Sequence, residues 1–231
     1  MSIAANIEKI EDGILQACLR SGRKREEITL MGVTKLQPPQ ALNDAWNAGL
    51  RHFGESRVQE AAVKFTGFRE KHAGAELHLI GSLQRNKAKT AASLFDCVQS
   101  VDRKALVEEL AKHAAGRGSP LPVLLEFRTG EDTKSGFTGI DELFYAAELA
   151  LASPSLRVIG LMTIAPNTGD EACLRAAFKR LVKARQELER RFPGQGLWSC
   201  LSMGMSADYQ IAVEEGSTLL RVGGAIFGER L

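Results

Sequence analysis

The chain has 231 residues, 44% of them hydrophobic, which suits one globular α/β domain with a large buried core. Its formal net charge of +2 gives no reason to expect a nucleic acid or a membrane surface as partner. The four cysteines and four histidines are scattered, without the spacing of a zinc site. The acidic N-terminal region is not a signal peptide, and the apolar runs are too short to span a bilayer. We therefore expect a reduced, cytoplasmic protein without a metal.

Apolar residues at helical spacing predict an amphipathic helix over residues 2–20, stopped near Gly22. Strands and helices then alternate. The predicted strands cover residues 28–34, 52–54, 77–80, 97–100, 123–127, 157–163, 198–202 and 218–222. The predicted helices between them cover residues 38–48, 56–72, 85–94, 102–115, 140–152, 169–191 and 207–215. Asp102 is a fair N-cap for the fourth of these helices.

Eight strand–helix units at this length predict a single (β/α)8 TIM barrel over residues 1–231. The helix at residues 1–21 is expected to pack on the outside of the barrel. A doubly wound open sheet is the alternative, and the missing GxGxxG motif after the first strand counts against it.

The first predicted strand, in the sequence ITLMGVTKLQ, ends on Lys35. In α/β proteins, chemistry sits at the carboxyl ends of parallel strands. A lysine held there is partly desolvated, which favours its neutral amine and lets it attack a carbonyl. Lys35 is therefore a candidate Schiff-base lysine, and the alternative is a surface lysine that follows a strand.

A phosphate site is predicted where the last two strands end, because this corner of TIM barrels often binds phosphate. After the seventh strand, Ser202 and Ser206 offer hydroxyls, Gly204 permits a close backbone approach, and a helix begins nearby. After the eighth strand, the N–H groups of Gly223 and Gly224 can reach a ligand. Ordinary turn chemistry is the alternative, since serine and glycine are common in such loops.

Arg221 lies on the last predicted strand and keeps its proton. Facing a pyridine nitrogen, it would keep that nitrogen unprotonated and make the ring a weak electron sink. A structural ion pair is the alternative. Three further segments follow strand ends, and their spacing leaves structural and functional roles open: HFGESRVQE at 52–60, HLIGSLQRNK at 78–87 and DTKSGF at 132–137.

Taken together, these motifs resemble the pyridoxal phosphate homeostasis proteins. The motifs are VTK, HFGES with VQE, HLIGSLQRNK, TKSGF, GLMTIAP, LSMGMSADY and GSTLLRVGGAIFGER, in the family's order from about residue 31 to residue 230. The family is similar in fold to the barrel domain of bacterial alanine racemase and of eukaryotic-type ornithine decarboxylase. The resemblance implies pyridoxal 5′-phosphate (PLP) as cofactor.

By position, the resemblance implies that Lys35 forms the aldimine with PLP and that Arg221 approaches the cofactor. It implies that Ile80 and Met205 line the two faces of the cofactor. The implied phosphate-binding set is Ser202, Gly204, Ser206, Gly223 and Gly224.

Three positions depart from the commonest family pattern. Ser56 stands where asparagine is usual, Arg57 where a tyrosine often follows, and Gly224 where a threonine hydroxyl often helps to hold the phosphate. We expect the last change to shift phosphate binding toward backbone N–H groups.

The resemblance implies a non-catalytic protein that holds PLP and buffers or delivers it in vitamin B6 homeostasis. The chain ends soon after the last strand, whereas racemases and decarboxylases of this fold add a β-domain and a partner subunit. No clear second acid/base group stands opposite Lys35, and an arginine at the pyridine nitrogen weakens carbanion stabilisation.

We expect a monomer with PLP and PLP-dependent apo-enzymes as partners. Two alternatives are a PLP-dependent amino-acid racemase and a cofactor-free Schiff-base aldolase for a phosphosugar.

Overall fold

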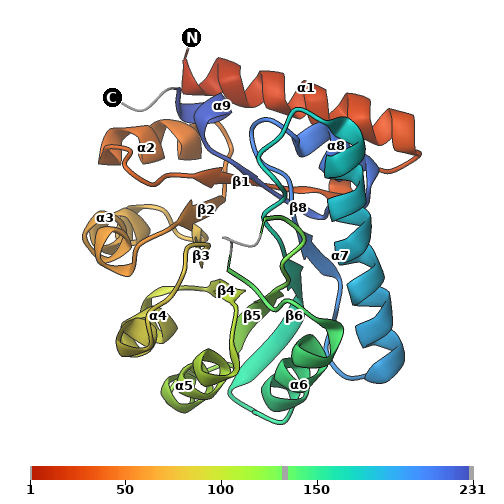
Figure 1. Cartoon of the computed structure of the whole chain (residues 1–231). Helices are drawn as coiled ribbons and strands as arrows, with labels where there is room; N and C mark the ends of the chain where they lie inside the picture. Colours follow the sequence, from red (N-terminus) through yellow and green to blue (C-terminus); the bar gives the residue numbers. More distant parts are fainter. Residues whose placement is uncertain (1, 132–134, 229–231) are drawn as a thin grey trace.

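Eight parallel strands close into a barrel, in which each strand pairs with the next and β8 pairs with β1 (Figure 1). The computed structural model describes residues 2–131 and 135–228. The strands are β1 Thr29–Val33, β2 His52–Glu55, β3 Glu76–Leu79, β4 Cys97–Val101, β5 Leu121–Glu126, β6 Leu156–Met162, β7 Cys200–Ser202 and β8 Leu219–Val222. This topology confirms the predicted (β/α)8 barrel.

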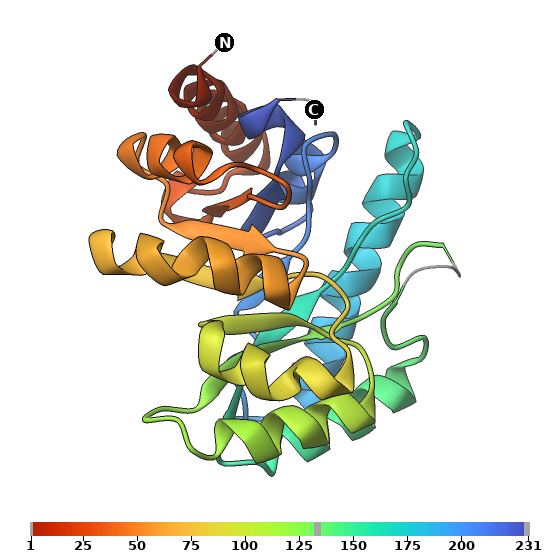
Figure 2. The same cartoon turned by 90° about the vertical axis from the view of Figure 1, so that its left-hand side faces the viewer.

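Helices form the outer layer, and α2 to α6 lie side by side around the strands (Figures 1 and 2). The helices are α1 Ile3–Ser21, α2 Pro39–Asn47, α3 Val58–Lys71, α4 Ala88–Leu94, α5 Lys104–Ala114, α6 Ile140–Leu151, α7 Glu171–Arg191, α8 Tyr209–Glu214 and α9 Gly224–Phe227. Within residues 2–131 and 135–228, none of the helices is long and apolar enough to cross a membrane.

Alternate residues of each strand face different environments, as the barrel geometry requires. One set packs against the helices and builds the main hydrophobic core. The other set faces the barrel interior, where a small apolar cluster consists of Cys97, Leu124 and Met162. Buried polar side chains share this interior, namely Gln99, Ser202 and Arg221. The interior therefore contains polar groups that reach toward the end of the barrel where the strands finish.

Helix α1 packs across α8 and α9, as Figure 1 shows. The Ser2 hydroxyl accepts a hydrogen bond from the N–H of Ala5 at the start of the helix, and Gly22 ends it with a φ of +68°. The buried face carries Ile7, Ile10 and Ile14. The helix predicted over residues 2–20 is thus confirmed.

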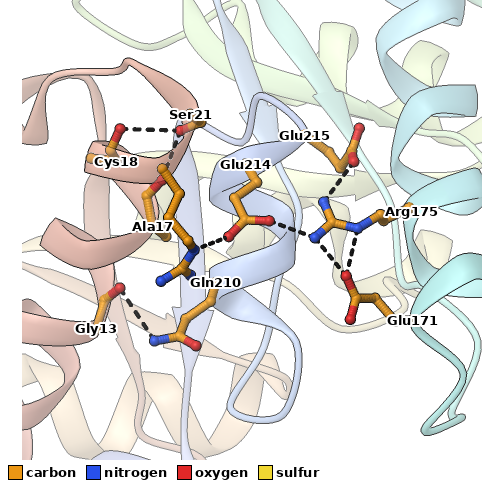
Figure 3. A network of polar contacts seen from close by, with 10 residues as sticks. Gly13, Ala17, Cys18, Ser21, Glu171, Arg175, Gln210, Glu214 and Glu215 are labelled. Carbon is orange, nitrogen blue, oxygen red and sulfur yellow. Dashed lines mark hydrogen bonds and ion pairs between the residues drawn. The ribbon is translucent and has the colours of Figure 1, made fainter.

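An ion-pair network ties α8 to both of its neighbouring helices (Figure 3). Arg175 of α7 lies 2.5 Å from a carboxylate oxygen of Glu214 and 2.8 Å from one of Glu215. Glu214 also accepts a 2.6 Å hydrogen bond from Arg20 of α1. Single exposed pairs contribute little, but this connected set fixes the helix that follows the β7 loop.

Four local predictions differ from the structure. Helix α5 begins at Lys104, and Asp102 does not cap it because its carboxylate pairs with Arg103. The strand predicted over residues 198–202 is shorter, since Trp198 has a φ of +45°, outside the strand region. The helix predicted over residues 85–94 is divided into a 3-10 turn, Arg85–Lys87, and α4. Helix α9 was not predicted, because its start on two glycines is typical of a turn.

Candidate cofactor site

Lys35 is the second residue after β1, at the end of the barrel where the strands finish, and its side chain is half-buried. The next residue, Leu36, has a φ of +62°, which is uncommon for a leucine. Glu60 of α3 accepts a 2.5 Å hydrogen bond from the Leu36 N–H. This contact holds the sharp turn that presents Lys35.

A buried charged network fixes the other side of the same turn. Glu55, at the end of β2, is fully buried and accepts hydrogen bonds from the Thr34 hydroxyl at 2.7 Å and from Lys64 Nζ at 2.8 Å. Lys64 Nζ also donates to the Thr34 carbonyl oxygen at 2.7 Å and to Glu60 at 2.9 Å. The residues before and after Lys35 are therefore both anchored to helix α3.

The loops after β7 and β8 meet through one hydroxyl. Ser206 Oγ accepts hydrogen bonds from the N–H groups of Gly223 and Ala225, at 3.3 and 3.2 Å. Among the residues that the structure describes, no acceptor is found for the N–H groups of Ser206, Ala207 and Gly224. Clustered N–H groups of this kind bind anions. The structure thus brings together three of the predicted phosphate residues, Ser206, Gly223 and Gly224.

Gly204 and Gly224 differ in the space that a side chain would find there. Gly204 has a φ of +94°, and a Cβ there would lie 2.6 Å from the Cβ of Ala212 and 2.9 Å from Leu220 Cδ2. Gly204 therefore permits the β7 loop to pack against α8 and β8. At Gly224 a Cβ would meet no atom within 4 Å. The space beside Gly224 is open, as a phosphate cradle requires.

Arg221 is buried in the barrel interior and is held by neutral groups. It donates to Ser202 Oγ at 2.7 Å and to the Thr163 carbonyl at 2.6 Å. Burial lowers the pKa of Arg221 to about 10, so it stays charged at neutral pH. Ser202 in turn donates to Gln99 Oε1 at 2.6 Å. The Ser202 hydroxyl therefore holds Arg221 in place inside the barrel. It takes no part in the contacts that Ser206 makes between the two loops.

The two predicted flanking residues follow strands on opposite sides of the barrel. Ile80 follows β3 and is half-buried, with its Cδ1 atom close to Gly54. Met205 follows β7 and is 37% exposed, and its N–H donates to Asp208 at 2.5 Å. Both residues therefore follow strands at the carboxyl end of the barrel.

A buried carboxyl group also lies at this end of the barrel. Glu126, the last residue of β5, accepts a 2.6 Å hydrogen bond from the Ser135 hydroxyl. Burial raises the pKa of Glu126 to about 7, and the negative charge of Asp102 acts in the same direction, against the positive charges of Arg221 and Arg103. A carboxyl group with such a pKa can exchange a proton near neutral pH.

Sequence reasoning missed Glu126, Gln99 and Lys64. The first two are polar residues in largely apolar strands, so strand alternation alone could have placed them inside the barrel. Lys64 stands four residues after Glu60, which is typical of an exposed helix pair, and nothing local shows that it reaches Thr34. Of the predicted mouth loop at 132–137, residues 132–134 lie outside the described residues.

The sequence profile of the alanine racemase N-terminal domain family matches residues 19–231. The barrel thus belongs to that class of domain. Curated relatives named pyridoxal phosphate homeostasis protein align along nearly the whole chain. The protein from Vibrio cholerae is 41% identical over 99% of this chain and 97% of its own. The protein from Aquifex aeolicus is 36% identical over 100% of this chain and 99% of its own. The chain therefore belongs to the pyridoxal phosphate homeostasis protein family, which confirms the resemblance.

Solved structures of related proteins are similar to this chain along nearly its whole length. PipY of Synechococcus elongatus with PLP bound is 33% identical, with a TM-score of 0.84 over 98% of this chain and 100% of its own. A protein of unknown function from Bifidobacterium adolescentis is 33% identical, with a TM-score of 0.91 over 97% of this chain and 94% of its own. Alanine racemase from Bacillus anthracis is 17% identical with a TM-score of 0.70, covering 96% of this chain and 56% of its own, and shows a shared fold alone.

Proposed function

We propose that this protein binds PLP at the carboxyl end of its barrel and serves intracellular PLP homeostasis by buffering or delivering the cofactor. Family membership and the PLP-bound PipY structure support this function. The observation that carries it is the order of groups on three neighbouring strands. The phosphate cradle follows β7 and β8, the buried Arg221 lies on β8, and Lys35 follows β1, which pairs with β8.

The residues present fit this cofactor. When bound, PLP supplies an aldehyde that a lysine amine can hold covalently and reversibly. Lys35 provides that amine. Ser206 Oγ accepts from the N–H groups of Gly223 and Ala225 and so fixes the loop on both sides of the open space at Gly224. Gly204 lets the β7 loop adopt the shape that places Ser206.

Arg221 favours a binding function over catalysis. Its guanidinium stays protonated, and Ser202 fixes its direction. A positive charge beside the ring nitrogen keeps that nitrogen unprotonated, so the ring withdraws electrons weakly. Ile80 and Met205 would then flank the ring without taking part in chemistry. We assign no catalytic residue.

A transfer assay tests this function. The PLP-loaded protein is mixed with a PLP-dependent apo-enzyme, and the return of the enzyme's activity is compared with that after an equal amount of free PLP. In parallel, added amino acids are monitored for exchange of the α-proton. We expect PLP transfer and no exchange at enzyme-like rates. A protein that binds no PLP, or that exchanges α-protons rapidly, would contradict the proposal.

A racemase-like activity is the second candidate, and one observation favours it. Glu126 is the last residue of β5, which lies across the eight-stranded barrel from β1 and Lys35. A proton-exchanging group opposite the lysine is what racemisation requires. If α-proton exchange is found, the Glu126→Gln variant should abolish it under this alternative, and should leave PLP transfer intact.

We further propose that the chain acts as one domain and as a monomer, with PLP-dependent apo-enzymes as recipients. Light scattering after size-exclusion chromatography tests the monomer. If PLP passes directly from this protein to the apo-enzyme, a scavenger of free PLP should not stop the transfer.

A further inference from the structure

Three side chains converge at the end of the barrel where the strands begin. His52 is the first residue of β2, Glu76 is the first of β3, and His78 is two residues further along β3. The backbones of His52 and Glu76 are paired in the strand register. This cluster lies at the end of the barrel opposite Lys35, because all strands run parallel. It is therefore distinct from the cofactor site, to which hydrogen bonds through Gln99 and Ser202 connect it.

The distances between the donor atoms suit a metal ion. His52 Nδ1 lies 3.3 Å from Glu76 Oε2 and 3.4 Å from His78 Nε2. His78 Nε2 lies 3.6 Å from the same Glu76 oxygen. Zinc bonds to nitrogen and oxygen are about 2.0–2.2 Å long, so neighbouring ligands in a tetrahedron are about 3.3–3.6 Å apart. The three atoms form one face of such a tetrahedron, and small shifts suffice to seat an ion.

The ligands are also accessible to an ion. The side chain of His78 is 6% exposed, those of His52 and Glu76 are 28% and 54% exposed, and an ion can thus enter from solvent.

The second nitrogen of the buried ligand has a partner of its own. His78 Nδ1 lies 3.0 Å from the side-chain amide of Gln99. Outer partners of this kind fix the ring orientation of metal-binding histidines. In this structure Gln99 Nε2 faces His78 Nδ1, and Gln99 Oε1 accepts from Ser202. Metal binding through His78 Nε2 leaves the ring proton on Nδ1, so it requires the Gln99 amide to turn over and Ser202 to accept from it.

We propose that His52, Glu76 and His78 bind one divalent transition-metal ion, zinc by ligand type, with a fourth position open to water. Two imidazoles and one carboxylate, with a solvent position, form a known zinc ligand set. The ion joins β2 to β3 where both strands begin, at the end of TIM barrels that serves stability. An open fourth position is typical of catalytic zinc sites, but this location is remote from the ends of the strands where TIM barrels carry chemistry, so the role we expect is to stabilise the pairing of β2 with β3.

The test uses the purified full chain, freed of PLP and treated with a chelator, and Co²⁺ as a coloured probe. We expect one Co²⁺ per chain, with the visible absorption of a four-coordinate site, displaced by one equivalent of Zn²⁺. His52→Ala and Glu76→Gln should each weaken Zn²⁺ binding by at least about 100-fold, since even outer partners of ligands are worth about 10- to 100-fold. Zn²⁺ should raise the melting temperature of the unmodified chain and not that of Glu76→Gln.

His113→Ala is the matched control. His113 lies 3.3 Å from Glu109 on the surface of α5, a single histidine–carboxylate pair, and its loss should leave metal binding unchanged. Cys173→Ser controls for the exposed thiol. Glu76 is more than half exposed, so Glu76→Gln should fold even if His52→Ala does not, and circular dichroism checks this. Absence of Co²⁺ and Zn²⁺ binding, binding that survives Glu76→Gln, or binding lost in Cys173→Ser would each overturn the proposal.

Discussion

Lys64 Nζ donates a 2.7 Å hydrogen bond to the carbonyl oxygen of Thr34, the residue that precedes Lys35. The same ammonium group pairs with the buried Glu55 at 2.8 Å. One lysine therefore positions another, because it holds the backbone turn from which Lys35 projects. Lys64 is a positioning residue in this account and touches no cofactor.

Replacement of Lys64 should affect both stability and binding. In Lys64→Met the carboxylate of Glu55 loses its buried partner, which we expect to cost about 3 kcal/mol of unfolding free energy. The freed turn should also weaken PLP binding about tenfold, that is, by about 1.4 kcal/mol. Urea denaturation and absorbance titration with PLP measure the two effects.

Lys183→Met is the matched control for this change. Lys183 is 75% exposed and lies 4.0 Å from Glu187 on the surface of α7, and such pairs contribute little. Equal losses in the two variants would contradict the positioning role of Lys64.

The Gly204 position should reject any side chain. Gly204→Ala places a Cβ 2.6 Å from the Cβ of Ala212 at a φ of +94°. Backbone strain and overpacking together should destabilise the fold by about 2–4 kcal/mol and disturb the Ser206 loop. Gly67→Ala in α3 is the control, since its Cβ would meet no atom within 4 Å, and it should stabilise by about 0.5–1 kcal/mol. Thermal and urea unfolding measure both changes. A Gly204→Ala variant with an unchanged free energy of unfolding would contradict this account of the β7 loop.

Restoring the hydroxyl at position 224 should tighten cofactor binding. A side chain fits at Gly224 without a clash, and one hydroxyl contact to phosphate is worth about 1 kcal/mol. Gly224→Thr should therefore lower the dissociation constant for PLP about fivefold, whereas Gly224→Ala should not. If alanine and threonine have the same effect, the phosphate does not lie beside this residue.

Glu126 predicts a specific dependence of stability on pH. Burial raises its pKa to about 7, above the value of about 4.3 in an unfolded chain. Between these values the native state binds more protons than the unfolded state, so the unfolding free energy falls as pH rises. The loss attributable to this group is about 3 kcal/mol between pH 4 and pH 8.

Glu126→Gln removes this titration and keeps a side chain that can accept the Ser135 hydrogen bond. Urea unfolding of both proteins across this pH range should show a smaller decline in the variant, while Asp102, Arg103 and Arg221 are unchanged. Parallel declines in the two proteins would show that the native fold does not raise the pKa of Glu126.

Much of the barrel could be predicted from sequence, because apolar strand runs alternate with amphipathic helices throughout. Local geometry was harder to predict: the φ of Trp198 shortens β7, and Asp102 forms an ion pair instead of a cap. The meeting of the β7 and β8 loops was predictable because Ser206 and Gly223 lie in loops whose place in a barrel is known.

The contacts that join distant segments were not predictable. Ser202 was assigned to the phosphate set, and only the folded chain shows its hydroxyl between Arg221 and Gln99. His52 and His78 are separated by 26 residues and meet only because β2 and β3 are paired. Sequence spacing reports metal sites within one segment and misses those that a sheet assembles.

The most direct test of the central claim is to map where PLP becomes attached. PLP is added to the purified protein, the absorption spectrum is recorded, borohydride fixes the link, and mass spectrometry identifies the modified peptide. We predict a yellow species and modification at Lys35 alone, both lost in Lys35→Ala. Modification spread over several lysines, or centred on Lys64, or none at all, would contradict the account.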